Sequence, residues 1–211
     1  MDTKLIGQIK EMLPFGQMCQ RNWDLTKEVD PEHIELFQQA MTYCPSNENN
    51  TYFKVHFIKN RELIEEICEY TDGPGPLIPK IDDPRQTQTL ANLLVLFEKW
   101  DDHDFIRGEE YGIDDLKAYR DQCNAIGIAA GYLIMVAQLL GYKTGMNICF
   151  EPKNQESIKN LMDLNDIPQI MVGVGFGQDK VSPLRHHIDK TSRWGVYWGT
   201  KQPPIYSKIW E

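Results

Sequence analysis

The sequence predicts an α+β fold, a sheet with helices packed around it and one apolar helix near its centre. Three observations favour this class. Helical patterns outnumber strand patterns along the chain, the strands do not alternate regularly with the helices, and residues 123–140 are apolar on nearly every side of a helix. The length of 211 residues suits a single domain spanning residues 1–211.

In the first third of the chain, helical and strand patterns follow one another. Residues 1–13 carry apolar side chains at helical spacing. Asp30-Pro31-Glu32 predicts the start of a second helix, since Asp suits the N-cap and Pro the first turn. Apolar residues then alternate, as in a strand with one buried face: Phe53, Val55 and Phe57. Residues 61–70 predict a short helix, which a run of glycine and proline ends.

Strands and helices are also predicted in the second half. Residues 90–97 are mostly apolar, which favours a buried strand. The apolar helix at 123–140 is followed by Gly141, a suitable residue for the C′ position. Another helix is expected at about 155–164, before a short, buried, glycine-rich strand in PQIMVGVGFG, residues 168–177.

Two segments have patterns that suit neither a core helix nor a core strand. Residues 99–121 are charged and interrupted by glycine, which predicts a surface insertion or lid. Its aromatic residues are candidates for shaping a pocket: Phe105, Tyr111 and Tyr119. The tail from about residue 192 is rich in aromatic residues, so we expect it to dock on another surface, such as a second subunit.

Composition limits the partners and the compartment. The formal net charge of -9 and the lack of a Lys/Arg run argue against nucleic-acid binding. The five cysteines are widely spaced without a C-x-x-C pair, which favours a reducing compartment over a disulfide framework or zinc site. The start lacks a signal-peptide pattern, and the apolar stretch at 125–140 is too short to span a bilayer. We therefore expect a cytoplasmic protein.

The familiar catalytic side-chain motifs are absent from the sequence. It contains no G-x-S-x-G, H-E-x-x-H or Walker motif. Cys19 and Cys44 could serve as nucleophiles, but a buried, inert thiol is the commoner role. GVGFG, residues 173–177, does not open a helix as a dinucleotide fingerprint must, so its glycines indicate close approach of another backbone or of a flat ligand. If the chain is an enzyme, we therefore expect a cofactor to carry the reaction.

Three segments, in order, resemble the motifs of the FMN-dependent nitroreductase family. In QMCQRNW, Arg21 and Trp23 occupy the basic and aromatic positions of the first motif. In CPSNENNTYF, the second motif matches at Pro45, Ser46, Asn49 and Phe53. In GIAAGYLIMVAQLLG, the helical motif matches at Gly127, Ala129, Leu133 and Gly141. The following loop of the family corresponds to residues 146–150, and GVGFG with Arg185 matches its last strand and the basic residue beyond.

The resemblance implies a mixed sheet flanked by helices, in an intertwined homodimer with FMN at the interface. It implies that the FMN phosphate is bound at the positions of Gln17, Cys19, Arg21 and Arg185. It places Pro45, Ser46 and Asn49 against the isoalloxazine, where an amide pairs with the pyrimidine edge. Asn147 lies in the loop whose backbone faces the flavin, and the backbone N–H near flavin N5 would come from around Ile148 and Cys149. No catalytic side chain and no metal is implied, because the chemistry occurs at N5.

Several positions depart from the family pattern. Gln17 stands where an arginine is usual and Cys19 where a serine is usual, and Pro183 replaces a second basic residue near Arg185. Phosphate binding would then depend on Arg21 and Arg185, with Lys180 as a further candidate. These substitutions predict weaker FMN binding.

The function implied by the resemblance is electron transfer from NADH or NADPH through FMN to a nitroaromatic, a quinone or a similar electron-poor acceptor. Two alternatives stay open at this point. An enzyme of the same fold could use flavin as its substrate and fragment it to a benzimidazole. A non-catalytic flavin-binding module could have lost its redox role with the changes at Gln17 and Cys19.

Overall fold

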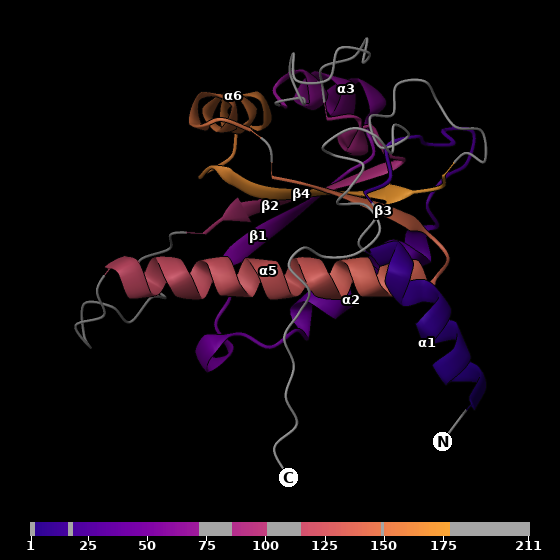
Figure 1. The fold of residues 1–211 in the computed structure, drawn as a ribbon. Coiled ribbons are helices and arrows are strands. Elements are labelled where there is room, and N and C mark those ends of the chain that lie inside the picture. The colour runs from indigo at the N-terminus through magenta and orange to yellow at the C-terminus, as the bar shows by residue number, and fades with distance from the viewer. Residues whose placement is uncertain (1–2, 17–18, 72–85, 101–114, 149, 178–211) are drawn as a thin grey trace, which may run out of the picture.

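The computed structural model describes residues 3–16, 19–71, 86–100, 115–148 and 150–177. Its sheet has the order β1-β2-β4-β3. The strands are β1 (Phe53–Ile58), β2 (Leu93–Lys99), β3 (Lys143–Asn147) and β4 (Pro168–Gly175). Every pairing among these strands is antiparallel. The strand order makes β1 and β3 the two edges of the sheet. The predicted α+β class is confirmed (Figure 1).

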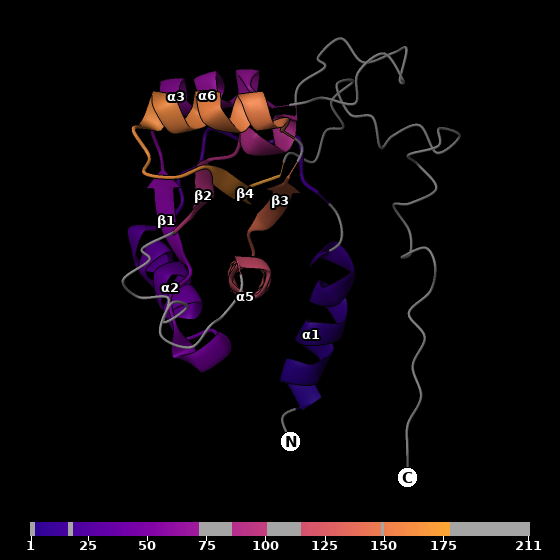
Figure 2. The ribbon, with the colours of Figure 1, turned by 90° about the vertical axis from the view of Figure 1, so that its left-hand side faces the viewer.

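Helices cover both faces of the sheet. They are α1 (Thr3–Gly16), α2 (Pro31–Thr42), α3 (Arg61–Glu69), α5 (Asp115–Leu139) and α6 (Pro152–Met162). Figure 2 shows α3 and α6 on one face and α2 and α5 on the other, with α1 beside α5. Two short 3-10 helices, η1 (Asn47–Asn49) and η3 (Thr87–Thr89), precede β1 and β2. Each face of the sheet therefore has its own apolar core.

Local sequence signals place several of these elements correctly. The Asp30 carboxylate accepts a hydrogen bond from the Glu32 N–H at 2.9 Å, which confirms the predicted N-cap of α2. Asn60 caps α3 in the same way through the Leu63 N–H. The continuous apolar run in β2 is explained by its central place: residues 93–97 are fully buried between the two helical layers.

The central apolar helix differs from its prediction in length and in burial. Helix α5 begins at Asp115, so its first two turns lie in the segment predicted as a lid, and residues 101–114 of that segment lie outside the described residues. Only one side of α5 is buried. Apolar residues on its other side are exposed: Ile128, Met135 and Leu139. By length and composition Tyr119–Leu139 could cross a membrane, although a core helix of a globular protein meets the same criterion.

Strand β3 is an element that the sequence analysis missed. Residues 146–150 are expected to form a loop, whereas Met146 and Asn147 belong to β3 and pair with Val172 and Met171 of β4. The segment Lys-Thr-Gly-Met-Asn has weak intrinsic strand preference. It becomes a strand because β4 offers it a full set of backbone partners.

Glycines of β3 and β4 accommodate the chain's own backbone. A Cβ atom at Gly173 would lie 2.2 Å from the Gln88 carbonyl oxygen, and one at Gly145 would lie 2.5 Å from the Gln20 carbonyl oxygen. Of the two roles predicted for the glycines of GVGFG, close approach of another backbone is therefore the one that Gly173 fulfils.

Candidate functional site

The segment that carries Cys19 and Arg21 lies along β3. The Gln20 N–H donates to the Thr144 carbonyl oxygen at 2.8 Å, and Trp23 forms an isolated bridge with Gly177. The indole N–H of Trp23 donates to the Thr87 carbonyl oxygen at 3.0 Å. These contacts fix the backbone on both sides of Arg21, which is half-buried and donates to the Cys19 carbonyl oxygen at 3.2 Å. A guanidinium is thereby held beside the edge strand of the sheet.

The end of β3 adjoins this segment. The Cys19 thiol donates to the Met146 carbonyl oxygen at 3.5 Å. Asn147 is buried with only 1% of its surface exposed, whereas its neighbours Met146 and Ile148 are 40% and 59% exposed. The structure therefore brings together four of the predicted site residues: Cys19, Arg21, Asn147 and Ile148. Three others lie outside the described residues: Gln17, Cys149 and Arg185.

The remaining predicted residues lie in the turn before β1. Ser46 donates its hydroxyl to the Asn50 carbonyl oxygen at 2.7 Å, and Asn47 donates to the Asp121 carboxylate at 2.9 Å. Asn49 adopts a left-handed backbone conformation, with φ of 58°, and is exposed. Its side chain makes no hydrogen bond among the described residues. Of the amides in this turn, Asn49 is thus available to a ligand, while Asn47 is held by Asp121.

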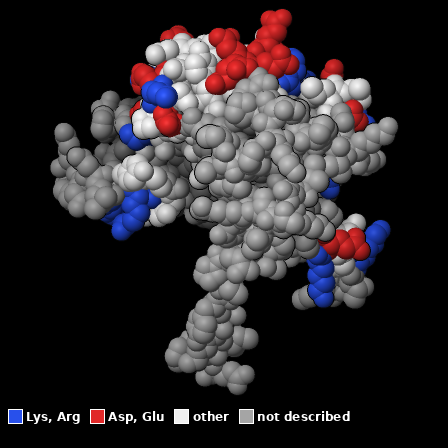
Figure 3. Space-filling view, turned by 45° about the horizontal axis from the view of Figure 1, so that its top comes forward, with Lys and Arg blue, Asp and Glu red and all other residues white. Residues whose placement is uncertain are grey.

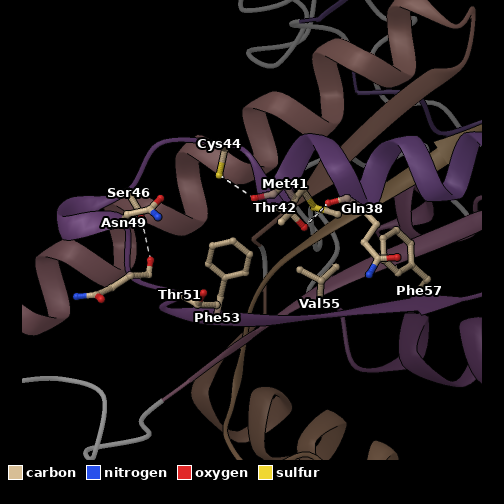
Figure 4. A pocket seen from close by; sticks show the side chains of 11 residues that line it. Gln38, Met41, Thr42, Cys44, Ser46, Asn49, Thr51, Phe53, Val55 and Phe57 are labelled. Atoms are coloured by element: carbon tan, nitrogen blue, oxygen red, sulfur yellow. Dashed lines mark hydrogen bonds between the residues drawn. The ribbon is translucent and has the colours of Figure 1, made fainter.

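A cavity of about 260 Å³ lies beside this turn, between α2 and β1. Figure 4 shows its apolar wall, made by Phe53, Val55 and Phe57, which face α2. Cys44 also lines it, and burial raises the pKa of its thiol, which donates to the Met41 carbonyl oxygen at 3.0 Å. A protonated, hydrogen-bonded thiol is a poor nucleophile, which supports the inert role for Cys44.

The two groups of predicted residues are separated by the width of the sheet. Cys19, Arg21 and Asn147 lie at the β3 edge, whereas Asn49 precedes β1 at the opposite edge. Arg21 and Asn49 therefore lie at opposite edges of the sheet within one chain. Acidic side chains gather elsewhere, on the exposed face of α3 (Figure 3), at Glu62, Glu65, Glu66 and Glu69.

Gln88 lies beside the end of β3 and is not among the site residues predicted from the sequence. Its side-chain amide is 3.4 Å from the Met146 carbonyl oxygen and 3.5 Å from Asn147 Oδ1, and the residue is 2% exposed. Nothing in QTQTLAN distinguishes this glutamine from a surface residue. Only the packing of η3 against β3 reveals its position.

Comparison with known proteins decides the family. The model of the nitroreductase family matches residues 17–178, which is more than half of the chain. The chain belongs to the nitroreductase family. The match begins at the segment before Arg21 and includes the turn at Asn49 and all of the sheet. Membership supports the assignment of this protein to the flavin oxidoreductases in general terms.

Solved structures share the fold at low sequence identity. A nitroreductase family protein from Streptococcus pneumoniae is 14% identical with a TM-score of 0.63, covering 86% of this chain and 97% of its own. Nitroreductase A from Vibrio parahaemolyticus is 13% identical with a TM-score of 0.64, covering 82% of this chain and 69% of its own. A putative NADH dehydrogenase/NAD(P)H nitroreductase from Parabacteroides distasonis is 14% identical with a TM-score of 0.60, covering 96% of this chain and 99% of its own. No curated protein matches the chain.

Proposed function

We propose that this protein is an FMN-dependent oxidoreductase that takes electrons from NADH or NADPH and delivers them to a nitroaromatic, a quinone or a similar electron-poor acceptor. One observation carries this proposal. The Arg21 guanidinium is hydrogen-bonded to Cys19, and the Cys19 thiol contacts Met146 at the exposed end of the edge strand β3. When bound, FMN supplies the redox chemistry of the site.

The residues of the β3 edge suit a flavin nucleotide. Arg21 offers a planar, permanently charged donor for a phosphate, and its backbone is fixed by the neighbouring contacts to β3. The backbone beyond Asn147 leaves the ladder and can offer an N–H group without a titrating side chain. Because Cys19 directs its thiol at the Met146 carbonyl oxygen, we propose that it supports the strand end as well as replacing the usual serine.

We propose that two chains form the site together. Arg21 and Asn49 lie at opposite edges of one sheet, which supports a site in which each chain supplies one of them. An exposed apolar surface is available for that contact on the helices α1 and α5: Leu5, Ile9, Leu13, Ile128, Met135 and Leu139. In such a homodimer, Asn49 of one chain would meet the flavin bound at the β3 edge of the other.

We further propose a cytoplasmic location, with small molecules rather than nucleic acid or membrane as ligands. Four described cysteines are free, Cys19, Cys44, Cys68 and Cys123, as expected in a reducing compartment. The net charge of -9 and the acidic face of α3 would repel a polyanion.

The visible spectrum of the purified protein tests the proposed function. We expect it to retain flavin absorbance after FMN addition and gel filtration, and we expect NADH or NADPH to bleach that absorbance under argon. A protein that retains no flavin would contradict the proposal. Retained flavin without bleaching would instead indicate a binding module, and loss of the flavin spectrum under oxygen would indicate a flavin-fragmenting enzyme.

Complementation between two variants tests the shared site. Arg21→Ala and Asn49→Ala each remove one half of the proposed site from every homodimer. A heterodimer of the two variants regains one intact site, with Arg21 from one chain and Asn49 from the other. We therefore expect co-expressed variants to bind more FMN than either variant alone, up to half of the wild-type amount per heterodimer. Binding no greater than in the separate variants would exclude a site shared in this way.

A further inference from the structure

Gln88 is the buried middle residue of η3 and packs against strands β3 and β4. Its neighbours hold it firmly: the Thr87 carbonyl oxygen accepts from the Trp23 indole, and the Thr89 hydroxyl donates to the Gln86 carbonyl oxygen at 2.9 Å. Strands β3 and β4 carry glycines where Gln88 packs. A Cβ atom at Gly145 would lie 2.7 Å from the Gln88 Cβ atom, so any larger residue there would displace it. The fold thus makes room for this side chain.

The amide of Gln88 is only partly satisfied. Its Nε2 makes long contacts of 3.4 and 3.5 Å to the Met146 carbonyl oxygen and to Asn147 Oδ1. Among the described residues, its Oε1 has no hydrogen-bond partner although it is fully buried. A buried acceptor without a partner destabilises a fold, and an apolar side chain of similar size would avoid that penalty. The contacts that the amide does make among the described residues are those of Nε2.

The contacts of the amide lie at the last fixed point of β3. Asn147 and Met171 form the final pair of the β3–β4 ladder, and the exposed Ile148 follows immediately. Two donors from different segments converge on the Met146 carbonyl oxygen, the Gln88 amide and the Cys19 thiol. Both contacts act on the peptide between Met146 and Asn147, the point from which the chain leaves the sheet.

We infer that Gln88 is a positioning residue for the cofactor: its amide orients the end of β3, and that end presents its backbone to the flavin. This inference rests on the proposed function. Gln88 itself is too buried to touch a ligand, so it acts through Met146 and Asn147. Among the described residues, the amide makes its side-chain contacts through Nε2, its donor.

The variant Gln88→Met tests the inference, because methionine keeps the length and volume of the side chain and removes both amide groups. Three quantities are measured: the unfolding midpoint of the flavin-free protein, hydrogen exchange in the peptide covering residues 144–150, and the dissociation constant and reduction potential of bound FMN. We expect an unchanged or raised midpoint, faster exchange, a dissociation constant about tenfold higher and a shifted potential.

Gln138→Met is the matched control. Gln138 donates to the Thr144 hydroxyl at 3.2 Å, so it contacts the same strand through the same kind of side chain, three residues before the end of β3. We expect the control to leave exchange at 144–150 and FMN binding unchanged.

The possible results separate this inference from the proposed function. A Gln88→Met protein that fails to fold, or that loses stability without a change in FMN potential, would show a merely structural role and overturn the inference. Equal affinity and potential in wild type and variant would also overturn it, while leaving the proposed function intact. If the wild type binds no FMN, the proposed function fails. Faster exchange at 144–150 in the flavin-free variant would still show that Gln88 holds the end of β3.

Discussion

Glu98 Oε2 lies 2.7 Å from His56 Nε2, a contact that joins the neighbouring strands β2 and β1. The other carboxylate oxygen of Glu98 accepts a hydrogen bond from the Asp166 N–H at 2.8 Å, although the side chain is 1% exposed. Burial acts to raise the pKa of Glu98, but the hydrogen bonds from His56 and Asp166 outweigh it, so the pKa lies below its ordinary value of 4.5. A charged group thus connects three segments inside the fold.

The depressed pKa of Glu98 predicts how stability depends on pH. A carboxyl whose pKa is lower in the folded state stabilises the fold fully above its unfolded value, here about 4.5, and loses that contribution as pH falls through the folded value. We expect Glu98→Gln to lower the free energy of unfolding by about 1–3 kcal/mol at pH 7, and by less at lower pH. Urea unfolding of the variant and of the wild type at a series of pH values measures this difference.

Glu65→Gln is the control for this prediction. Glu65 pairs with Arg61 at 2.9 Å but is 60% exposed, so its removal should change stability little at any pH. The role assigned to the Glu98 carboxylate would be contradicted if Glu98→Gln and wild type differed in their free energy of unfolding by the same amount at every pH in the acid range.

Arg21→Ala should weaken FMN binding while leaving the fold nearly as stable. A hydrogen bond to a charged group contributes about 1.5–3 kcal/mol, so we expect the FMN dissociation constant to rise roughly tenfold to a hundredfold. Flavin fluorescence titration measures the constant, and thermal unfolding of the flavin-free protein measures stability. Equal FMN affinity in this variant and wild type would disprove the phosphate assignment.

Arg61→Ala should show the opposite behaviour. The Arg61 guanidinium donates to the carbonyl oxygens of Leu90 and Ala91 at 3.1 and 3.2 Å, so it serves the fold at the start of β2. We expect lower stability and unchanged FMN affinity per folded molecule. The two arginine variants together separate a binding role from a structural one.

Gly173→Ala should destabilise the protein by about 1–3 kcal/mol, because a methyl group at this position meets the backbone of Gln88 and has no room to shift. Gly7→Ala is the matched control in helix α1, where nothing lies within 4 Å of the added Cβ atom. There we expect a gain of about 0.5–1 kcal/mol from the better helix former. Urea unfolding shows whether each substitution lowers or raises the free energy of unfolding.

The cysteines should differ in reactivity toward iodoacetamide. Cys44 is 7% exposed with a pKa raised by burial, and Cys68 is fully buried, whereas Cys123 is exposed on α5. We expect mass spectrometry to find Cys123 modified first, and Cys44 and Cys68 modified only when urea is added. Rapid labelling of Cys44 in the folded protein would contradict its placement against Met41.

Elements with strong local signals follow from the sequence. The N-cap at Asp30 and the alternation at Phe53, Val55 and Phe57 depend on residues close together in the chain, and both are confirmed. The site residues are predicted only through a family resemblance, and the structure places four of them at the β3 edge: Cys19, Arg21, Asn147 and Ile148. The expected loop at 146–150 was wrong where β3 forms, since that strand depends on pairing with β4.

Hydrophobic period, capping residues and motif order can be found in the chain without its fold, so they were enough to predict the α+β class, the main helices and the family. Only the folded chain reveals that Arg21 and Asn49 lie at opposite sheet edges and that Gln88 lies beneath the end of β3. These relationships join residues far apart in the chain. They arise from strand order and packing, which no local pattern records.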